Sequence, residues 1–349
     1  MLARQLLAGL LRPRANLGVD FHTYLAAARV GMTHSWSAIY DQGLVAAAQH
    51  ELASRQYGQA FLSPPAVAWL ASALSVLPYQ VAYEAWALLS LAILMAALTW
   101  SAPSGSSPPW TLALAAMSSW WVIEAIQVGQ VVPLVAAIVL VFWRLLRENR
   151  EFASGLVFGL ILLKPNTPFL VLPALLVAGR FRALAGVVVT AVALSALSVG
   201  TVGIAGISDY LGQLRGPLPG GSDVLSLHRA LGIGGIQVTA LKGIIVALTM
   251  ATTYLARQRP GRWLPAAIVG SLLVSPYLHT SDLCLLTVAG WMAWHEWTSA
   301  GARAPLAVIW VVSAPLTWFV PKWPAVNRWP LIEVAVVLAT AVSAVAWSR

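Results

Sequence analysis

Charged residues are scarce in this sequence. Asp, Glu, Lys and Arg make up 9% of its 349 residues, whereas ordinary soluble domains contain about 25%. So few charges cannot cover the surface of a soluble protein of this length. A disordered chain is excluded as well, because disorder requires low hydrophobicity and high net charge. The composition therefore predicts a protein that is solvated largely by lipid.

Several familiar motifs are absent too. The single cysteine, Cys284, can form neither an internal disulfide nor a cysteine metal site. The sequence contains no P-loop, no G-x-S-x-G turn and no H-E-x-x-H helix. Its 12 acidic residues form no obvious cluster, so we predict no cofactor and leave a divalent metal ion open. The net charge of +9 comes from basic residues in short loops, which argues against nucleic-acid binding.

Apolar residues are abundant. They make up 59% of the chain, and the mean hydropathy is +0.77. Because backbone in lipid must satisfy its own hydrogen bonds, the apolar segments are predicted to be helices. The predicted fold class is all-α, a polytopic membrane bundle of about 11–12 segments, some of them short or re-entrant. We expect these segments at residues 61–79, 80–100, 109–127, 129–146, 152–163, 166–179, 183–207, 231–255, 263–278, 282–297, 304–320 and 330–347.

Two of these segments, 152–163 and 166–179, are too short to cross a bilayer. They are predicted to be half-helices that meet at Lys164-Pro165-Asn166 inside the protein, where interrupted backbone can line a cavity. A cation at such a place needs an anionic partner. The sequence does not decide between a substrate phosphate and a structural carboxylate as the partner of Lys164.

The chain divides into residues 1–60, a basic segment followed by an amphipathic loop, and residues 61–349, the bundle. Residues 1–14 are too short to cross a membrane. Short loops rich in arginine mark the cytoplasmic side. Residues 15–60 lack a basic excess, so we expect them outside, although their side depends on whether 109–127 crosses. The cytoplasmic clusters are Arg144/Arg147/Arg150, Arg180/Arg182 and Arg257/Arg259/Arg262.

Asp20 stands in the amphipathic segment, four residues before Tyr24. If this stretch is helical, the two side chains share one face. Asp20 is then either the N-cap of the helix or a carboxylate that accepts a proton from a substrate hydroxyl. Asp282 follows His279 in a turn between two apolar segments, and local sequence favours a helix cap for it.

Taken in order, five motifs resemble the polyprenol-phosphate-dependent glycosyltransferases of family 87, members of the GT-C superfamily. The resemblance covers about residues 18–290, and it looks closest to bacterial α-mannosyltransferases that extend lipid-anchored mannosides. The motifs are Asp20-x-x-x-Tyr24 with Trp36-x-x-x-Tyr40-Asp41, Phe61-Leu62-Ser63-Pro64-Pro65-Ala66, Gly129-Gln130, Ala153-Ser154-Gly155-Leu156 through Leu163-Lys164-Pro165, and Ser275-Pro276-Tyr277.

The resemblance implies an inverting transfer of a hexose, with mannose expected, from a polyprenyl phosphate to a hydroxyl of a lipid or glycan acceptor. It places the protein in the bacterial plasma membrane with its active site on the extracytoplasmic face. Asp20 matches the catalytic carboxylate of the first extracytoplasmic loop, and Lys164 matches the family's Lys-Pro position, which suits a developing phosphate charge. The expected substrate-binding residues are Tyr24, Lys164, His279, Asp282, Arg229 and Gln130.

This chain departs from the family pattern in two ways. The family has a full transmembrane helix before the aspartate, whereas here only a short basic stretch precedes Asp20, which indicates a late start or an incomplete enzyme. Ser63 stands where the family often has an aromatic residue. A transporter and an inactive scaffold of cell-envelope glycolipid synthesis are the alternative functions. A transporter would be expected to show internal repeats, and Lys164-Pro165 has no counterpart in the second half.

Overall fold

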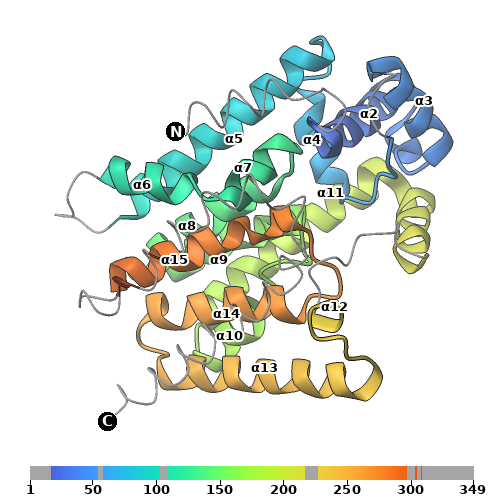
Figure 1. Ribbon diagram of the computed structural model, residues 1–349. Helices are drawn as coiled ribbons and strands as arrows, with labels where there is room; N and C mark the ends of the chain where they lie inside the picture. Colours follow the sequence, from blue (N-terminus) through green and yellow to red (C-terminus); the bar gives the residue numbers. More distant parts are fainter. Residues whose placement is uncertain are drawn as a thin grey trace.

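The computed structural model describes residues 17–53, 58–102, 109–216, 227–296, 303–304 and 308. In these ranges every regular element is a helix, and the helices pack side by side (Figure 1). The predicted all-α bundle is therefore confirmed. The basic stretch 1–14 and nearly all of the predicted segments 304–320 and 330–347 lie outside the described residues. The division at residue 60 stays a prediction.

Three described helices are long and apolar enough to cross a membrane: α5 (Tyr79–Ser101), α11 (Phe181–Arg215) and α13 (Gly235–Leu255). In the most apolar window of α11 only 11% of the residues are buried, and in α13 only 22%. Apolar side chains that no protein covers indicate contact with lipid. Figure 1 shows α5 and α13 at opposite edges of the bundle. A polytopic membrane protein is thus the class that the helices define.

The interior is built around α8 (Val132–Arg147), which contacts α5, α9 (Glu151–Phe158), α14 (Pro260–Val274) and α15 (Cys284–Glu296). Apolar residues fill most of α8, and those of α14 are buried on every side. A helix that is apolar all round is typical of the core of a large protein or of a membrane bundle.

The arginine clusters gather at one end of these helices, because α8 and α13 end there and α9 and α14 begin there. Arg180 pairs with Glu151 at 2.7 Å and also donates to the carbonyl of Arg257 at 3.4 Å. The three loops that were predicted to be cytoplasmic therefore lie together. This is the arrangement that the positive-inside rule requires of one membrane side.

Two predicted spans are wrong as single helices. The segment 61–79 contains only α4 (Pro65–Ser72), which begins at a proline and ends in turns before Pro78. The segment 109–127 is divided into α6 (Pro109–Met117) and α7 (Trp120–Gln127). At the division, the hydroxyls of Ser118 and Ser119 donate to carbonyls of the preceding turn at 2.6 and 3.0 Å. Side-chain hydroxyls that bond local backbone compete with helix continuation.

The predicted half-helices are confirmed. After α9 the chain continues as a 3-10 turn, η2 (Gly159–Leu163), and the helix ends at Lys164, whose φ is −150° and ψ 78°. The next helix, α10 (Val171–Val177), begins seven residues later. The interruption has partners in the protein, because Ser271 of α14 accepts the N–H of Leu170 at 2.9 Å. This is how non-helical backbone is tolerated at membrane depth.

The amphipathic segment folds into α2 (Val19–Thr33), the 3-10 turn η1 (Trp36–Ala38) and α3 (Gln42–Ala53), with α2 packed against α3 and α4. The predicted segment 183–207 ends too early, because α11 continues to Arg215. Gly203, at φ 76°, kinks α11. Beyond the kink α11 reaches the amphipathic segment, where Gln213 donates to the carbonyl of Tyr40 at 2.5 Å and accepts from Gln42 at 2.6 Å.

Helices α9 and α11 pack closely because glycine lies at the contact. A Cβ added to Gly155 would lie 1.8 Å from the carbonyl oxygen of Ala183, which is backbone and cannot give way cheaply. We expect Gly155→Ala to lower the free energy of unfolding by about 3 kcal/mol or more, at or above the usual cost of overpacking. Thermal unfolding of the purified protein in detergent measures this loss. Gly200→Ala is the control, because its Cβ meets nothing within 4 Å; equal stability of both variants would contradict the prediction.

Candidate active site

The start of α2 is bound to the loop between α7 and α8. The N–H of Gly18 donates to the carbonyl of Gln127 at 2.6 Å, and that of Asp20 donates to the carbonyl of Val128 at 2.8 Å. Gly129 is required in this loop, because its φ is +71° and a Cβ there would lie 2.5 Å from Cβ of Phe21. These contacts fix the backbone of Asp20 to the bundle.

Both oxygens of the Asp20 carboxylate accept a hydrogen bond from a glutamine amide. Gln130 Nε2 donates to Oδ2 at 2.7 Å, and Gln59 Nε2 donates to Oδ1 at 2.5 Å. The Gln130 amide is itself oriented, because its Oε1 accepts from the Tyr24 hydroxyl at 2.6 Å and from the N–H of Val131 at 3.0 Å. The N-cap interpretation of Asp20 is wrong, since Gly18 occupies that position. Asp20 is partly exposed and held in one orientation.

Tyr24 and Gln130 are buried, at 4% and 6% exposed, whereas the carboxylate that Gln130 bonds is partly exposed. Their geometry makes them positioning residues for Asp20. The predicted contact of these two side chains with substrate stays a prediction.

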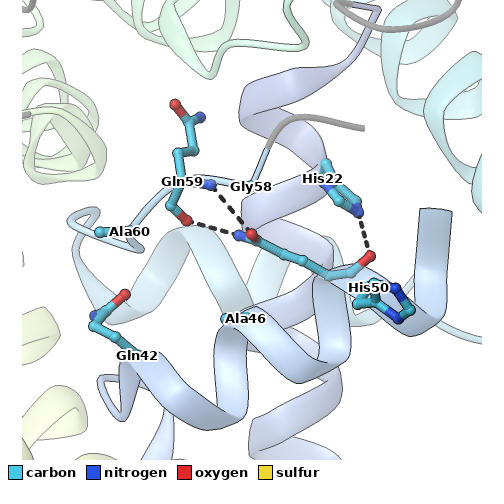
Figure 2. Close-up of a pocket in the computed structure, with 8 residues that line it drawn as sticks. His22, Gln42, Ala46, His50, Gly58, Gln59 and Ala60 are labelled. Atoms are coloured by element: carbon cyan, nitrogen blue, oxygen red, sulfur yellow. Dashed lines mark hydrogen bonds between the residues drawn. The ribbon is translucent and has the colours of Figure 1, made fainter. Parts of the chain in front are cut away.

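Gln59 is in turn held by Gln49 of α3. The Gln49 amide donates to the Gln59 carbonyl at 2.7 Å and accepts from the Gln59 N–H at 3.1 Å, and the Gln49 carbonyl bonds His22 Nε2 at 2.8 Å (Figure 2). Sequence reasoning missed both glutamines, which belong to none of the five motifs. No local signal marks them, since an amide in a helix, like Gln49, or in an irregular stretch, like Gln59, is ordinary.

A hollow of about 410 Å³ lies beside the hydrogen-bonded pair Gln49 and Gln59, which we call the amide clamp. In Figure 2 the side chain of Gln59 extends away from Ala46 and Gln42, and Asp20 is not among the residues that line the hollow. The hollow is therefore not the site around Asp20. It is lined by His22, Gln42, Ala46, Gln49, His50, Gly58, Gln59 and Ala60.

Lys164 and Asp282 form an ion pair with 2.7 Å between Nζ and Oδ1, and the Asp282 side chain is fully buried. The partner of Lys164 in this structure is thus a carboxylate. The other oxygen of Asp282 accepts the N–H of His279 at 2.8 Å, at the start of the 3-10 turn η3 (Thr280–Leu283). His279 is the N-cap of η3, and Asp282 at its N3 position accepts the N–H of that N-cap, so Asp282 caps the turn from within and not as its N-cap. The same side chain also neutralises Lys164.

His279 and Tyr277 lie beside the ion pair, and we call these two residues, Lys164 and Asp282 the cluster. Its Nε2 shares a hydrogen bond with the Tyr277 hydroxyl at 2.5 Å, and the rings meet edge to face. The Asn166 amide donates to the Tyr277 carbonyl at 3.4 Å, which ties the turn after Lys164 to the turn after α14.

Asp20 lies in the electrostatic field of this cluster. Burial raises the pKa of Asp20, while the Gln59 hydrogen bond and the charges of Lys164 and His279 act to lower it. Burial lowers the pKa of His279, which favours the neutral ring at pH 7. Burial and the two carboxylates raise the pKa of Tyr277 to about 12, so its hydroxyl stays protonated. The structure thus brings together a carboxylate, an ion pair and a neutral imidazole.

The site lies at the ends of helices opposite the arginine clusters. Gln130 precedes α8, Lys164 follows η2 and His279 follows α14, whereas the arginines occupy the other ends of α8, α9 and α14. Of the remaining predicted residues, Arg229 lies in α12 (Leu227–Leu231), and its side chain falls outside the described part. In the described ranges no group of three or more His, Cys, Asp or Glu side chains is placed to hold a metal ion. The predicted absence of a cofactor stays a prediction.

Fold and site define an integral membrane protein with a polar, carboxylate-containing site at the helix ends opposite its arginines. The sequence model of glycosyltransferase family 87 matches residues 61–276, more than half of the chain. The protein belongs to this family and is a membrane glycosyltransferase. No curated protein and no solved structure matches the chain. The matched range includes Gln130 and Lys164 but not Asp20, His279 or Asp282. The roles of these last three residues therefore rest on the geometry of the site.

The buried pair can be tested by a double-mutant cycle. Because Lys164→Met leaves the Asp282 carboxylate buried and unpaired, we expect it to lower the free energy of unfolding by about 3–5 kcal/mol. Adding Asp282→Asn removes that uncompensated charge and restores part of the loss. Thermal unfolding of the two single variants, the double variant and the wild type measures the coupling. Strictly additive losses would show that the two charges do not stabilise each other.

Proposed function

We propose that this protein transfers a hexosyl unit, with mannose the expected sugar, from a polyprenyl phosphate to a hydroxyl of a lipid or glycan acceptor. The reaction inverts the anomeric carbon and takes place on the extracytoplasmic face of the bacterial plasma membrane. Family membership supports the reaction class. The observation that carries the mechanism is the partly exposed Asp20 carboxylate, which two amides hold within the electrostatic field of the Lys164 and Asp282 pair.

Asp20 acts as the general base. The acceptor oxygen attacks the anomeric carbon while its proton passes to the Asp20 carboxylate, and the bond between that carbon and the phosphate oxygen breaks. The polyprenyl phosphate leaves with the bonding electrons. Because Gln59 and Gln130 bond both carboxylate oxygens, the carboxylate needs no reorientation when the acceptor arrives.

Lys164 stabilises the negative charge that develops on the leaving phosphate. An ammonium has three N–H donors, and the bond to Asp282 uses one of them and fixes the position of the cation. The neutral ring of His279 suits a hydrogen bond to a sugar hydroxyl. Arg229 is assigned to the phosphate by resemblance.

The extracytoplasmic placement is supported by the arginines. They gather at the helix ends opposite Asp20 and Lys164, and short basic loops face the cytoplasm. A site at the other ends then meets donors that have been presented on the outer leaflet.

Asp20→Asn tests the base. The amide keeps the shape of the side chain and removes the proton acceptor, so we expect sugar transfer to fall by about 10²–10⁴-fold. Membranes that contain equal amounts of wild type or variant receive radiolabelled polyprenyl-phosphate mannose, and label in the acceptor product is counted after chromatography has separated it from the labelled donor lipid. Asp41→Asn is the control, because exposed Asp41 only accepts the N–H groups of Gly43 and Leu44 at 2.9 and 3.1 Å.

Equal transfer by wild type and Asp20→Asn would overturn the base assignment. If wild type transfers no sugar, the donor class is wrong, and the transporter and scaffold functions take precedence.

The pH profile tests how Asp20 is held. A base works when ionised, so activity falls as pH falls through the pKa of Asp20. The Gln59 hydrogen bond lowers that pKa, so Gln59→Leu raises it and moves the acidic limb of the profile to higher pH. The Gln49 bonds to the Gln59 backbone remain in this variant. Initial rates across the acidic range show the shift; His50→Asn, at the same hollow, leaves the limb in place. An unmoved limb in Gln59→Leu would contradict the arrangement.

A further inference from the structure

The described cluster around Asp20 has too little positive charge for an anionic donor. Asp20 and Asp282 are two carboxylates, Lys164 is one ammonium, and the lowered pKa of His279 favours its neutral form. These groups together are negative, and a phosphodiester-linked sugar brings a further negative charge. Like charges in a poorly solvated place repel strongly. If the proposed function holds, cations outside these four groups have to meet the phosphate: Arg229 is assigned there by resemblance, and the described part of the chain offers a second one.

Lys242 of α13 is suitably placed. It lies seven residues after the start of α13 at Gly235, on a helix whose Ile236 and Ile244 are 84% and 56% exposed. Three ion pairs occur in the described part of the chain, and Lys242 belongs to none of them. An unpaired ammonium within an apolar helix is costly and marks a functional site by default.

The Lys242 ammonium is directed into the protein. Its Nζ donates to the carbonyl of Ser275 at 3.5 Å, a long bond that leaves other donors free, and the side chain is only partly exposed. A lysine that only snorkels would extend toward the headgroups and away from protein backbone. Lys242 therefore has a position that lipid solvation alone does not explain.

Ser275 links Lys242 to the site. The Ser275 hydroxyl lies 2.6 Å from the Tyr277 carbonyl and 3.4 Å from that of Asn166. Asn166 follows Lys164 by two residues, and Tyr277 bonds His279 at 2.5 Å. Lys242 thus reaches the cluster from the lipid-facing helix α13, which Figure 1 shows at the edge of the bundle beside α14.

We infer that Lys242 binds the phosphate of the polyprenyl-linked donor as it enters from the bilayer, and that it supplies the positive charge missing from the cluster around Asp20. The inference rests on the proposed function for the identity of the ligand. The same lysine also holds the polyprenyl phosphate that is released, because its phosphate carries more charge than that of the donor.

The test uses the full chain in nanodiscs of neutral phosphatidylcholine. Lys242→Met keeps the length and apolar stem of the side chain and removes its charge. We expect the KM for polyprenyl-phosphate mannose to rise about 10-fold to 100-fold, as expected for loss of a bond to a charged group. The Kd for polyprenyl phosphate, measured directly by tryptophan fluorescence, rises in parallel. The KM for the acceptor stays unchanged, and Lys242→Arg restores donor binding.

Thr239→Val is the matched control, an exposed position on the same helix whose hydroxyl bonds only the Gly235 carbonyl. It leaves the KM for the donor and the Kd for polyprenyl phosphate unchanged. Thermal unfolding checks that all variants are folded; if Lys242→Met is unfolded, the comparison moves to Lys242→Gln.

Three results would overturn the inference. The first is an unchanged Kd for polyprenyl phosphate in Lys242→Met. The second is a loss of affinity that appears equally in Thr239→Val. The third is an effect seen only when phosphatidylglycerol is added, which would assign Lys242 to bulk anionic lipid. Because binding is measured without turnover, a wild type that binds polyprenyl phosphate through Lys242 but transfers no sugar contradicts the proposed function alone.

Discussion

The interrupted helix at Lys164 is the constraint on which the rest of the site depends. A chain that leaves the helical path at membrane depth exposes backbone groups that lipid cannot satisfy. Here protein side chains satisfy several of them: Ser271 accepts the N–H of Leu170, and the Thr167 hydroxyl donates to the carbonyl of Lys164 at 3.1 Å. A buried α14 must therefore lie against the break. The end of α14 then brings Asp282 and His279 to Lys164.

The general base is built on a second, independent anchor. Asp20 belongs to a helix of the amphipathic segment, but its backbone is bonded to the loop before α8 and its carboxylate to Gln130. Gln59 reaches the same carboxylate from the stretch that follows α3. Two parts of the chain separated by more than sixty residues thus define one side-chain orientation. Such convergence suits a base that has to meet its proton without rearrangement.

The sequence identified those features that conflict with an apolar surrounding. Asp20, Lys164 and Asp282 could be singled out because ionisable groups are expensive near lipid, and the break at Lys164 followed from segments too short to cross. The amide clamp of Gln49 and Gln59 could not be predicted, because it depends on how α3 folds back onto α2. The single span at 61–79 was wrong because hydropathy does not register the turns before Pro78. The end of the predicted segment 183–207 was wrong because α11 continues beyond its kink, where it contacts other parts of the protein.

Because of the bend at Gly203, one helix belongs both to the membrane bundle and to the amphipathic segment that carries Asp20. Before the bend α11 is a lipid-facing membrane helix, and after it Gln213 is bonded to Tyr40 and Gln42. The amphipathic segment that carries Asp20 is therefore bonded to a helix that is largely exposed to lipid, although α9 packs against one side of it. A membrane whose thickness changes the tilt of α11 also distorts the hydrogen bonds between Gln213 and the amphipathic segment. The thickness of the membrane can therefore change the position of the Asp20 carboxylate. The membrane is also the solvent from which the donor arrives.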